Sequence, residues 1–362
     1  METGNQMLNR EPDYPLKDLY LYLTDHCNLC CTHCWISPKF SQDQQDGLSL
    51  DALKKTISEA KSLGLQGVKL TGGEPLLYRD LIELLKFLAL DKFTISIETN
   101  GILIDRKMIE SFQSSDVAQI SVSLDSASEE VHDGIRGVKG SFHHTLKGLR
   151  LLSDSGLNFQ IIMTLQRKNR KEIPGLIGLS EKIGAGSLKI NPLQPCGRAM
   201  DAFKRRNNLE LDELIHLHRR VEEEWSRQDN LEIFFDLPVA FLSIEEIKRN
   251  GSCQCRILNI LGVLADGDFS ICGIGQTIDE LRLGNLHQIS IREVWENNPV
   301  LKELRQSLPG KLKGICHHCI FKFQCLGACR AMAFSHARDL YAPYFLCQEF
   351  YDSGLFPSSR YI

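Results

Sequence analysis

The sequence has no apolar run long enough to cross a membrane. A spanning helix needs about 18 or more predominantly apolar residues, and the longest candidates, LIELLKFLAL and IIMTL, are short and flanked by charge. Charge of one sign is not in excess either, since 42 basic residues face 46 acidic ones and the formal net charge is -4. We therefore expect neither a membrane nor nucleic acid among the partners of this chain.

An apolar signal segment is also missing, because the N-terminal stretch METGNQMLNREPDYP is polar. The chain nevertheless contains 13 cysteines in 362 residues, an odd number that is spread unevenly. Disulfide-rich secreted domains are shorter and denser in cysteine, so a disulfide framework is not expected. We predict a cytoplasmic protein with reduced thiols that hold metal.

Hydrophobic patterning divides the chain into two parts. Between about residues 17 and 195, β-rich runs alternate with helical stretches such as 49–62 and 142–153. The six runs are 18–23, 67–70, 93–98, 118–124, 158–165 and 187–190. Strand–helix units in series predict a parallel sheet, curved or closed, with functional residues on the loops that follow the strands. After a polar, basic segment and a helix at about 211–227, cysteine becomes dense, which places a domain boundary near residue 235.

The first predicted strand is followed by a cysteine loop, LTDHCNLCCTHCW. It holds Cys27, Cys31 and Cys34 in the spacing C-x3-C-x2-C. Three thiolates on one tight loop suit a four-iron, four-sulfur cluster whose fourth iron is left open for a substrate. The same spacing also suits a structural zinc ion with His26 or His33 as the fourth ligand.

The motifs after the later strands resemble those of the radical S-adenosylmethionine (radical SAM) superfamily, whose partial (β/α)6 barrel carries such a loop after its first strand. The segment TGGEP at 71–75 resembles the family's GGEP, which receives the methionine ammonium group. Glycines let the backbone approach closely, and an acidic side chain meets a cation. The segment HDGIRG at 132–137 resembles one whose arginine holds the methionine carboxylate. The residues that the resemblance assigns to S-adenosylmethionine are Gly72, Gly73, Glu74, Glu98, Asn100, Ser123, Asp125, Arg136 and Leu165.

A second group of cysteines lies in the C-terminal third. Four of them form the run C-x2-C-x5-C-x3-C, and this pattern resembles the SPASM extension of radical SAM enzymes, which is known for two auxiliary clusters. The resemblance assigns one cluster to Cys253, Cys255, Cys272 and Cys329, and the other to Cys316, Cys319, Cys325 and Cys347. Zinc sites built from the same cysteines are the alternative. Upstream of Cys272, the run GVLADGDFSICG predicts a β-hairpin that turns at Asp266 and Gly267.

Taken together, the resemblance implies a fold and a reaction. We expect an α/β protein: a partial (β/α)6 TIM-type radical SAM barrel at 17–235, after an extension at 1–16 and before a small cysteine-rich SPASM domain at 236–362. We expect three [4Fe-4S] clusters, S-adenosyl-L-methionine, and an electron donor such as ferredoxin or flavodoxin. The reaction would begin with reductive cleavage of S-adenosylmethionine to a 5′-deoxyadenosyl radical. Auxiliary clusters further indicate net oxidation of the substrate. The sequence identifies no catalytic base.

The resemblance favours oxidative crosslinking of a ribosomally synthesised precursor peptide. Gly273 follows Cys272 where formylglycine-forming enzymes carry an aspartate base, which disfavours that activity. Few residues precede the first strand, so we expect a leader to be bound by a separate protein or by the enzyme's own surface. The basic loop at 198–206 suits an acidic leader or a carboxylate substrate. The alternatives are a tetrapyrrole or other small-molecule substrate, as in haem or haem d1 synthesis, and a non-catalytic iron–sulfur or zinc scaffold.

Overall fold

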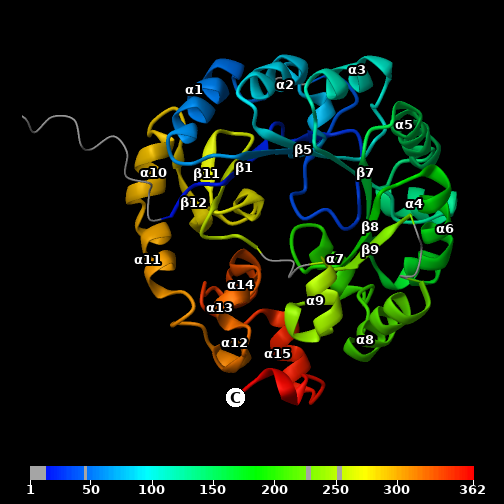
Figure 1. The fold of residues 1–362 in the computed structure, drawn as a ribbon, viewed down its shortest axis with the longest axis vertical. Helices are drawn as coiled ribbons and strands as arrows, with labels where there is room; N and C mark the ends of the chain where they lie inside the picture. The colour runs from blue at the N-terminus through cyan, green and yellow to red at the C-terminus, as the bar shows by residue number, and fades with distance from the viewer. Residues whose placement is uncertain (1–13, 45–46, 226–229, 251–254) are drawn as a thin grey trace, which may run out of the picture.

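A single ten-stranded sheet runs through the protein (Figure 1). The computed structural model describes residues 14–44, 47–225, 230–250 and 255–362. The sheet has the order β12-β11-β10-β1-β4-β5-β6-β7-β8-β9. The six predicted strands are all present and pair in parallel, as β1 (Asp18–Tyr22), β4 (Gly67–Thr71), β5 (Thr94–Thr99), β6 (Gln119–Ser123), β7 (Phe159–Leu165) and β8 (Ser187–Pro192). The predicted parallel α/β fold is therefore confirmed.

Helices cover the outer face of these strands and leave the inner face polar. Figure 1 shows the helices ranged around the outside of a curved sheet; they are α1 (Leu50–Lys61), α2 (Leu81–Leu90), α3 (Arg106–Ser114), α4 (Glu129–Arg136), α5 (Ser141–Ser155) and α6 (Ile173–Ile183). The predicted helix at 49–62 begins where the side chain of Ser49 accepts a hydrogen bond from the Ala52 amide. Along β7, buried and half-buried residues alternate, because every second side chain packs under the helices.

The sheet also contains four strands that the alternating pattern does not predict on the barrel. β9 (Glu232–Phe235) pairs in parallel with β8, and β10 (Ile260–Val263) pairs in parallel with β1. β11 (Asp268–Ser270) and β12 (Arg282–Asn285) then continue from β10 in antiparallel fashion. The predicted hairpin at Asp266 and Gly267 is thus confirmed, and Gly267 has the positive φ of 88° that the turn requires. The chain after residue 255 therefore extends the sheet from β1.

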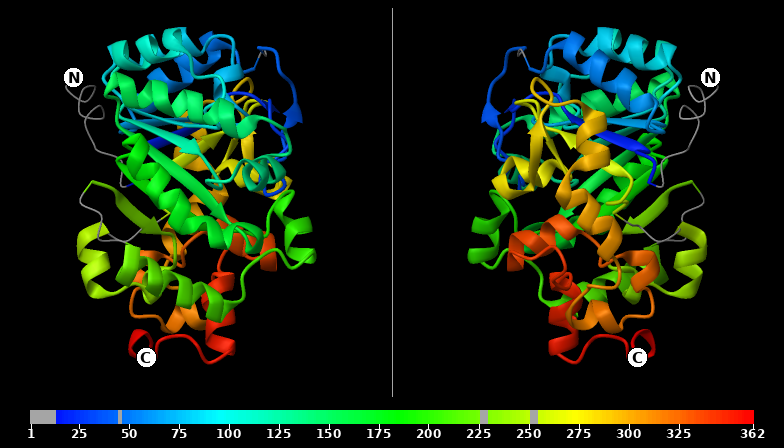
Figure 2. Two further views of the ribbon diagram at one scale, coloured as in Figure 1. Left: turned by 90° about the vertical axis from the view of Figure 1, so that its right-hand side faces the viewer. Right: turned by 90° about the vertical axis from the view of Figure 1, so that its left-hand side faces the viewer.

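The cysteine-rich part of the chain is built from short helices. They are α9 (Ile244–Asn250), α10 (Ile291–Asn297), α11 (Pro299–Ser307), α12 (Gly314–His318), α13 (Lys322–Cys325), α14 (Arg330–Ala337) and α15 (Phe345–Asp352). Figure 2 shows the last four, in orange and red, at the end of the molecule opposite α1 to α3. Two further short helices, α7 (Ala199–Lys204) and α8 (Leu211–Arg220), precede the boundary predicted near residue 235. The predicted helix at 211–227 is α8 followed by a π-helical turn, Val221–Trp225. Within the described ranges, every helix is too short or too polar to cross a bilayer.

Candidate metal centres and S-adenosylmethionine site

The cysteine loop after β1 is fixed by backbone contacts to segments distant in the sequence. The amide of Cys30 donates to the carbonyl of Arg136 at 3.0 Å, at the end of α4. The amide of Arg198 donates to the carbonyl of Cys34 at 2.9 Å, from the start of α7. A Cβ at Gly73 would lie 2.0 Å from the carbonyl oxygen of His26, so only glycine allows the loop to approach β4 this closely.

The three predicted thiols of this loop gather at one place. Cys27 and Cys31 are buried and Cys34 is half-buried, whereas Cys30 is exposed. Burial raises the pKa of the Cys27 thiol, and the nearby charges of Glu74, Cys31 and Cys34 raise it further. Such a group of thiols stays protonated unless a metal centre supplies positive charge.

The spacing of the thiols distinguishes a cluster from a single ion. A tetrahedral zinc ion with bonds of about 2.3 Å holds its sulfur ligands about 3.8 Å apart. Among the residues that the structure describes, the one set of three or more possible ligand atoms within 4.8 Å of one another is His218, Glu222 and Glu246, away from this loop. The three loop thiols do not form such a set, so at least one pair of their sulfur atoms lies more than 4.8 Å apart, wider than in such a zinc site.

Hydrogen-bond donors surround the loop thiols. The amide of Leu29 lies 3.4 Å from the Cys27 sulfur, and the side-chain nitrogen of Asn100 lies 3.9 Å from it. The same Asn100 nitrogen donates to the side chain of Asn28 at 2.7 Å. Asn28 lies between the first two cysteines and was not predicted as a site residue, since an asparagine in a loop ordinarily indicates only a turn. These donors favour thiolate over thiol, as a metal cluster requires.

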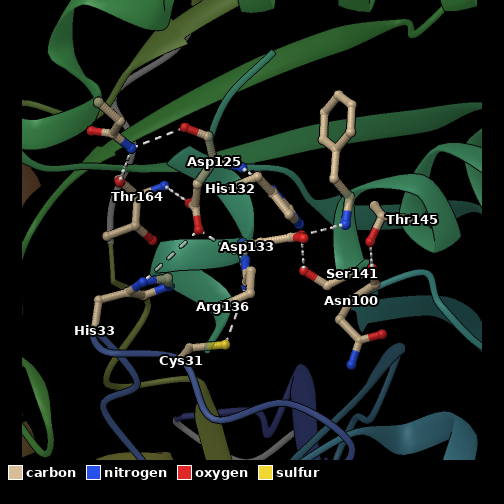
Figure 3. A network of polar contacts seen from close by, with 12 residues as sticks. Cys31, His33, Asn100, Asp125, His132, Asp133, Arg136, Ser141, Thr145 and Thr164 are labelled. Atoms are coloured by element: carbon tan, nitrogen blue, oxygen red, sulfur yellow. Dashed lines mark hydrogen bonds and ion pairs between the residues drawn. The ribbon is translucent and has the colours of Figure 1, made fainter. Parts of the chain in front are cut away.

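Arg136 and Asp125 form a buried ion pair beside the loop (Figure 3). The Nε atom of Arg136 lies 2.8 Å from Asp125, and its Nη1 atom lies 3.7 Å from the Cys31 sulfur. The amide of Thr164 donates to Asp125 at 2.9 Å. Burial by itself raises the pKa of Asp125, but Arg136, the neighbouring histidines and the Thr164 amide together lower it below the usual value. The structure thus brings both predicted residues to the loop, with the arginine already bound to the aspartate.

Two neutral histidines complete this polar region. The ring of His132 is fully buried, and its Nδ1 atom accepts the amide hydrogen of Asp125 at 3.3 Å. Burial lowers the pKa of His132 to about 4, and that of His33 to about 4 as well. Figure 3 shows both rings close to Asp125. At neutral pH neither histidine adds positive charge, so Arg136 is the cation that faces the loop here.

Glu74 is buried at the end of β4 and accepts three hydrogen bonds. Its donors are the amide of Leu76 at 3.1 Å, the hydroxyl of Thr99 at 2.6 Å and the amide of Asn100 at 2.8 Å. Burial raises the pKa of its carboxyl to about 7. A carboxylate offers about four lone-pair sites, so one remains for a cationic ligand. Beside it, Gly72 has a φ of 128°, a conformation that glycine adopts readily.

The remaining predicted contacts lie on or beside the inner face of the barrel. Glu98, on β5, accepts a hydrogen bond from Lys69 at 2.8 Å. Ser123 is half-buried at the end of β6, and Leu165 is buried at the end of β7. Of the predicted set, these three residues have no described contact with the loop.

The first C-terminal set of thiols is next to the barrel. Cys255, Cys272 and Cys329 lie together: a hydrogen bond from Cys255 lowers the pKa of Cys329 to about 7, and Cys272 adds to the charge around Cys255. Cys253 lies outside the described residues. The hydroxyl of Tyr22, on β1, accepts the Gly273 amide hydrogen at 2.9 Å. A Cβ at Gly273 would be 2.1 Å from the Tyr22 ring, which gives a physical reason for the glycine there.

The second C-terminal set surrounds a hollow. Cys316, Cys319, Cys325 and Cys347 all line it, and it contains about 320 Å³ of space free of protein atoms, part of which is open to solvent. Burial raises the pKa of Cys325 to about 11. Four thiols around one space provide every ligand of a four-iron cluster.

Cys196, which belongs to none of the three predicted sets of metal ligands, is buried between the cysteine loop and the first C-terminal set. Its sulfur lies 4.0 Å from the carbonyl of Trp35, which follows Cys34, and 3.8 Å from the hydroxyl of Thr277. It also contributes to the charge felt by Cys272. Together with Tyr22, this residue joins the cysteine loop to the first C-terminal set.

Comparison with known proteins gives two family matches. Residues 21–179 match the radical SAM superfamily, and residues 253–320 match an iron–sulfur cluster-binding domain, SPASM. The chain is 28% identical over 335 residues to the AdoMet-dependent heme synthase of Methanosarcina barkeri, covering 88% of this chain and 92% of that protein. It is 28% identical over 331 residues to mycofactocin maturase MftC of Mycolicibacterium smegmatis, covering 89% and 80%.

A solved structure has the same fold. SuiB of Streptococcus suis, in its complex with the precursor peptide SuiA, superposes with a TM-score of 0.74 at 18% identity. The alignment covers 92% of this chain and 76% of that one.

Proposed function

Because the chain belongs to the radical SAM superfamily and carries a SPASM iron–sulfur domain, we propose that this enzyme oxidatively crosslinks a ribosomally synthesised peptide. Cys27, Cys31 and Cys34 would hold the [4Fe-4S] cluster that, when bound, supplies the electron for cleavage of S-adenosylmethionine to the 5′-deoxyadenosyl radical. The eight C-terminal cysteines would hold two further clusters, with Cys253 completing the first of them.

The residues around the loop have separate tasks in this proposal. Glu74 keeps one acceptor site for the methionine ammonium group, and Gly72 and Gly73 let the backbone come close to it. Arg136 has N–H groups beyond those used by Asp125 and Cys31, and these suit the methionine carboxylate. Asp125 holds the guanidinium in place from a fully buried position. The binding energy thus fixes the substrate before any bond is broken.

The proposal of a peptide substrate rests on the side chains of the inner face of the barrel. On the described strands β1 and β4 to β9, the inward-facing cations are Lys69 and Lys189, and each has an acidic partner. Lys69 lies 2.8 Å from Glu98, and Lys189 lies 3.6 Å from Asp236. Other inner residues are neutral hydrogen-bonding groups such as Gln160. A substrate with several carboxylates, such as a tetrapyrrole, would need cations that have no acidic partner in the protein. A peptide backbone instead matches a neutral, hydrogen-bonding surface.

A crosslink removes two hydrogen atoms from the peptide. One leaves as a hydrogen atom to the deoxyadenosyl radical and gives 5′-deoxyadenosine. The other leaves as a proton and an electron, so an electron acceptor must be close. An iron–sulfur cluster held by the first C-terminal set of cysteines would accept this electron, and that set is joined to the barrel through Tyr22 and Gly273.

A tetrapyrrole substrate is the second candidate. It is favoured by the similarity to an AdoMet-dependent heme synthase over most of both chains. The mycofactocin maturase, at the same 28% identity, favours a peptide instead. The pairing of Lys69 and Lys189 with acidic side chains supports the peptide.

The test uses the anaerobically reconstituted full-length enzyme with S-adenosylmethionine and dithionite. It is incubated in parallel with the short peptides encoded beside its gene and with an iron coproporphyrin. We expect 5′-deoxyadenosine in both reactions, and a peptide lighter by two hydrogen atoms only in the first. Loss of carboxyl groups from the porphyrin, with unchanged peptides, would establish the second candidate. No 5′-deoxyadenosine from protein with full iron content would leave a non-catalytic scaffold.

A further inference from the structure

Arg330, the first residue of α14, has a fully buried guanidinium that its protein neighbours satisfy only in part. Its Nη1 atom donates to the carbonyl oxygens of Leu340 at 3.1 Å and Ala342 at 2.7 Å. Within the described residues, its Nε and Nη2 atoms have no hydrogen-bond partner. Because an unpaired buried charge is strongly unfavourable, these N–H groups require an anionic partner.

The groups around Arg330 that can carry negative charge are cysteine sulfurs from both C-terminal sets. Burial lowers the pKa of the guanidinium, and the thiols of Cys316, Cys329, Cys325 and Cys255 act in the opposite direction. Cys255 and Cys329 belong to the set next to the barrel, whereas Cys316 and Cys325 line the hollow of the other set. The guanidinium therefore lies between the two sets and within electrostatic reach of each.

The backbone leaves room for this cation. Gly327 has a φ of 78°, and a Cβ at this position would lie 2.5 Å from Nη2 and 2.6 Å from Cζ of Arg330. Any larger residue at 327 would push the guanidinium out of its position. The turn between Cys325 and Cys329 is thus shaped around a charge, although an apolar side chain would fill the space at lower cost.

We propose that Arg330 is the shared counter-charge of the two auxiliary clusters, donating its remaining N–H groups to cluster sulfur and raising both reduction potentials. The inference rests on the proposed assignment of the eight C-terminal cysteines to two clusters. Reduction adds one electron to a centre that already carries four thiolates, and a fixed cation stabilises the added negative charge. Arginine suits this role because it stays protonated at every accessible pH. Arg330 is a positioning residue, distant from the S-adenosylmethionine site.

The experiment compares the wild type with Arg330→Gln and Arg330→Lys in the full-length, reconstituted protein. Each is titrated anaerobically with dithionite and followed by electron paramagnetic resonance. S-adenosylmethionine is added to identify the loop cluster, because that cluster is the one with an open iron. We expect Arg330→Gln to shift both auxiliary midpoints to more negative potentials, with a smaller shift in Arg330→Lys and none at the loop cluster.

Arg305→Gln is the matched control. Arg305, on α11, also donates from Nη1 to a backbone carbonyl, that of Trp295 at 2.6 Å, and its Nη2 atom has no partner among the described residues. It has no cysteine among its charge neighbours, so its substitution should leave all midpoints unchanged.

Several results would overturn the inference. Unchanged midpoints in Arg330→Gln, a shift at only one auxiliary cluster, or equal shifts in Arg305→Gln would each do so. If both Arg330 variants lose iron and secondary structure together, Arg330 has only a packing role. Failure of the cluster assignment itself is recognised separately, because the wild type would then lack auxiliary signals and the corresponding iron.

Discussion

The cysteine loop and the C-terminal cysteines hold their thiols in different surroundings. The loop is attached to strand ends, and charged or amide side chains such as Arg136, Asp125 and Asn100 face it. Among the described C-terminal thiols, Cys316 and Cys347 are buried in the hydrophobic core and Cys255, Cys272, Cys319 and Cys329 pack against it, with Arg330 as a buried cation nearby. A site that must bind a zwitterionic ligand needs several polar groups, whereas an electron-transfer site needs shielding from water. The surroundings of the two sets of thiols are consistent with the separate tasks proposed for them.

The cysteine loop and the C-terminal cysteines are linked by specific contacts of Tyr22. Tyr22 is at the end of β1, immediately before the loop, and its hydroxyl contacts the residue after Cys272. Its ring also packs edge-on against Trp35, with ring centres 6.1 Å apart. The regions are also joined inside the sheet, where β1 pairs in parallel with β10.

The largest expected effects come from removing one cysteine from the loop or one from the C-terminal sets. We expect Cys31→Ala to abolish formation of 5′-deoxyadenosine. The loss of activity should exceed the roughly 100-fold loss caused by replacing a residue that only hydrogen-bonds to a metal ligand. The C-terminal iron should remain. Cys325→Ala is the counterpart, and it should keep S-adenosylmethionine cleavage while losing the oxidised product. Chromatographic assay of 5′-deoxyadenosine and iron analysis give both readings. Surviving cleavage in Cys31→Ala would show that the loop assignment is wrong.

An intermediate effect tests the link. Gly273→Ala should destabilise the protein by about 1–3 kcal/mol, because the new methyl group overlaps the ring of Tyr22. The cost should fall sharply in the Tyr22→Leu background, where the ring is absent. Urea unfolding of the four proteins in a double-mutant cycle measures the coupling. Purely additive changes would contradict the close contact between β1 and the turn after Cys272.

The smallest effect concerns pH and the loop region alone. Burial lowers the pKa of His132 to about 4, so between the unfolded value of 6.5 and 4 the unfolded chain binds a proton that the folded chain does not. Stability must therefore fall as the pH decreases through this range. From pH 7.5 to 5.5 we expect His132 to account for about 1 kcal/mol of lost stability.

His132→Asn should remove that contribution, since the asparagine oxygen can still accept the Asp125 amide. The measurement is urea unfolding at both pH values, with His318→Asn, at an exposed position, as the control. An equal acid loss in His132→Asn and the wild type would mean that the buried ring is not responsible.

The six barrel strands could be predicted because each is a short β-rich run between amphipathic helices, a local property of the sequence. β9 and β10 were not predicted as members of the barrel sheet. Residues 232–235 and 260–263 are short, and their partner strands are fixed by tertiary packing. Similarly, motif spacing identified Arg136 and Glu74, but not that Asp125 and Thr99 already bind them. Glu98, which the resemblance assigns to the ligand, forms an ion pair with Lys69, and its contact with the ligand stays a prediction.

The sequence alone predicted the parallel α/β fold, the resemblance to the radical SAM superfamily and the grouping of the cysteines, because spacing along the chain constrains which thiols can share one loop or turn. The folded structure was needed to show that Gly273 leaves room for the ring of Tyr22 and that Gly327 leaves room for the guanidinium of Arg330. It was also needed to show that the inward-facing Lys69 and Lys189 are paired with acidic side chains. Each of these depends on atoms from strands or helices far apart in the sequence. Close packing and charge pairing between such segments are properties of the folded chain, and no local pattern encodes them.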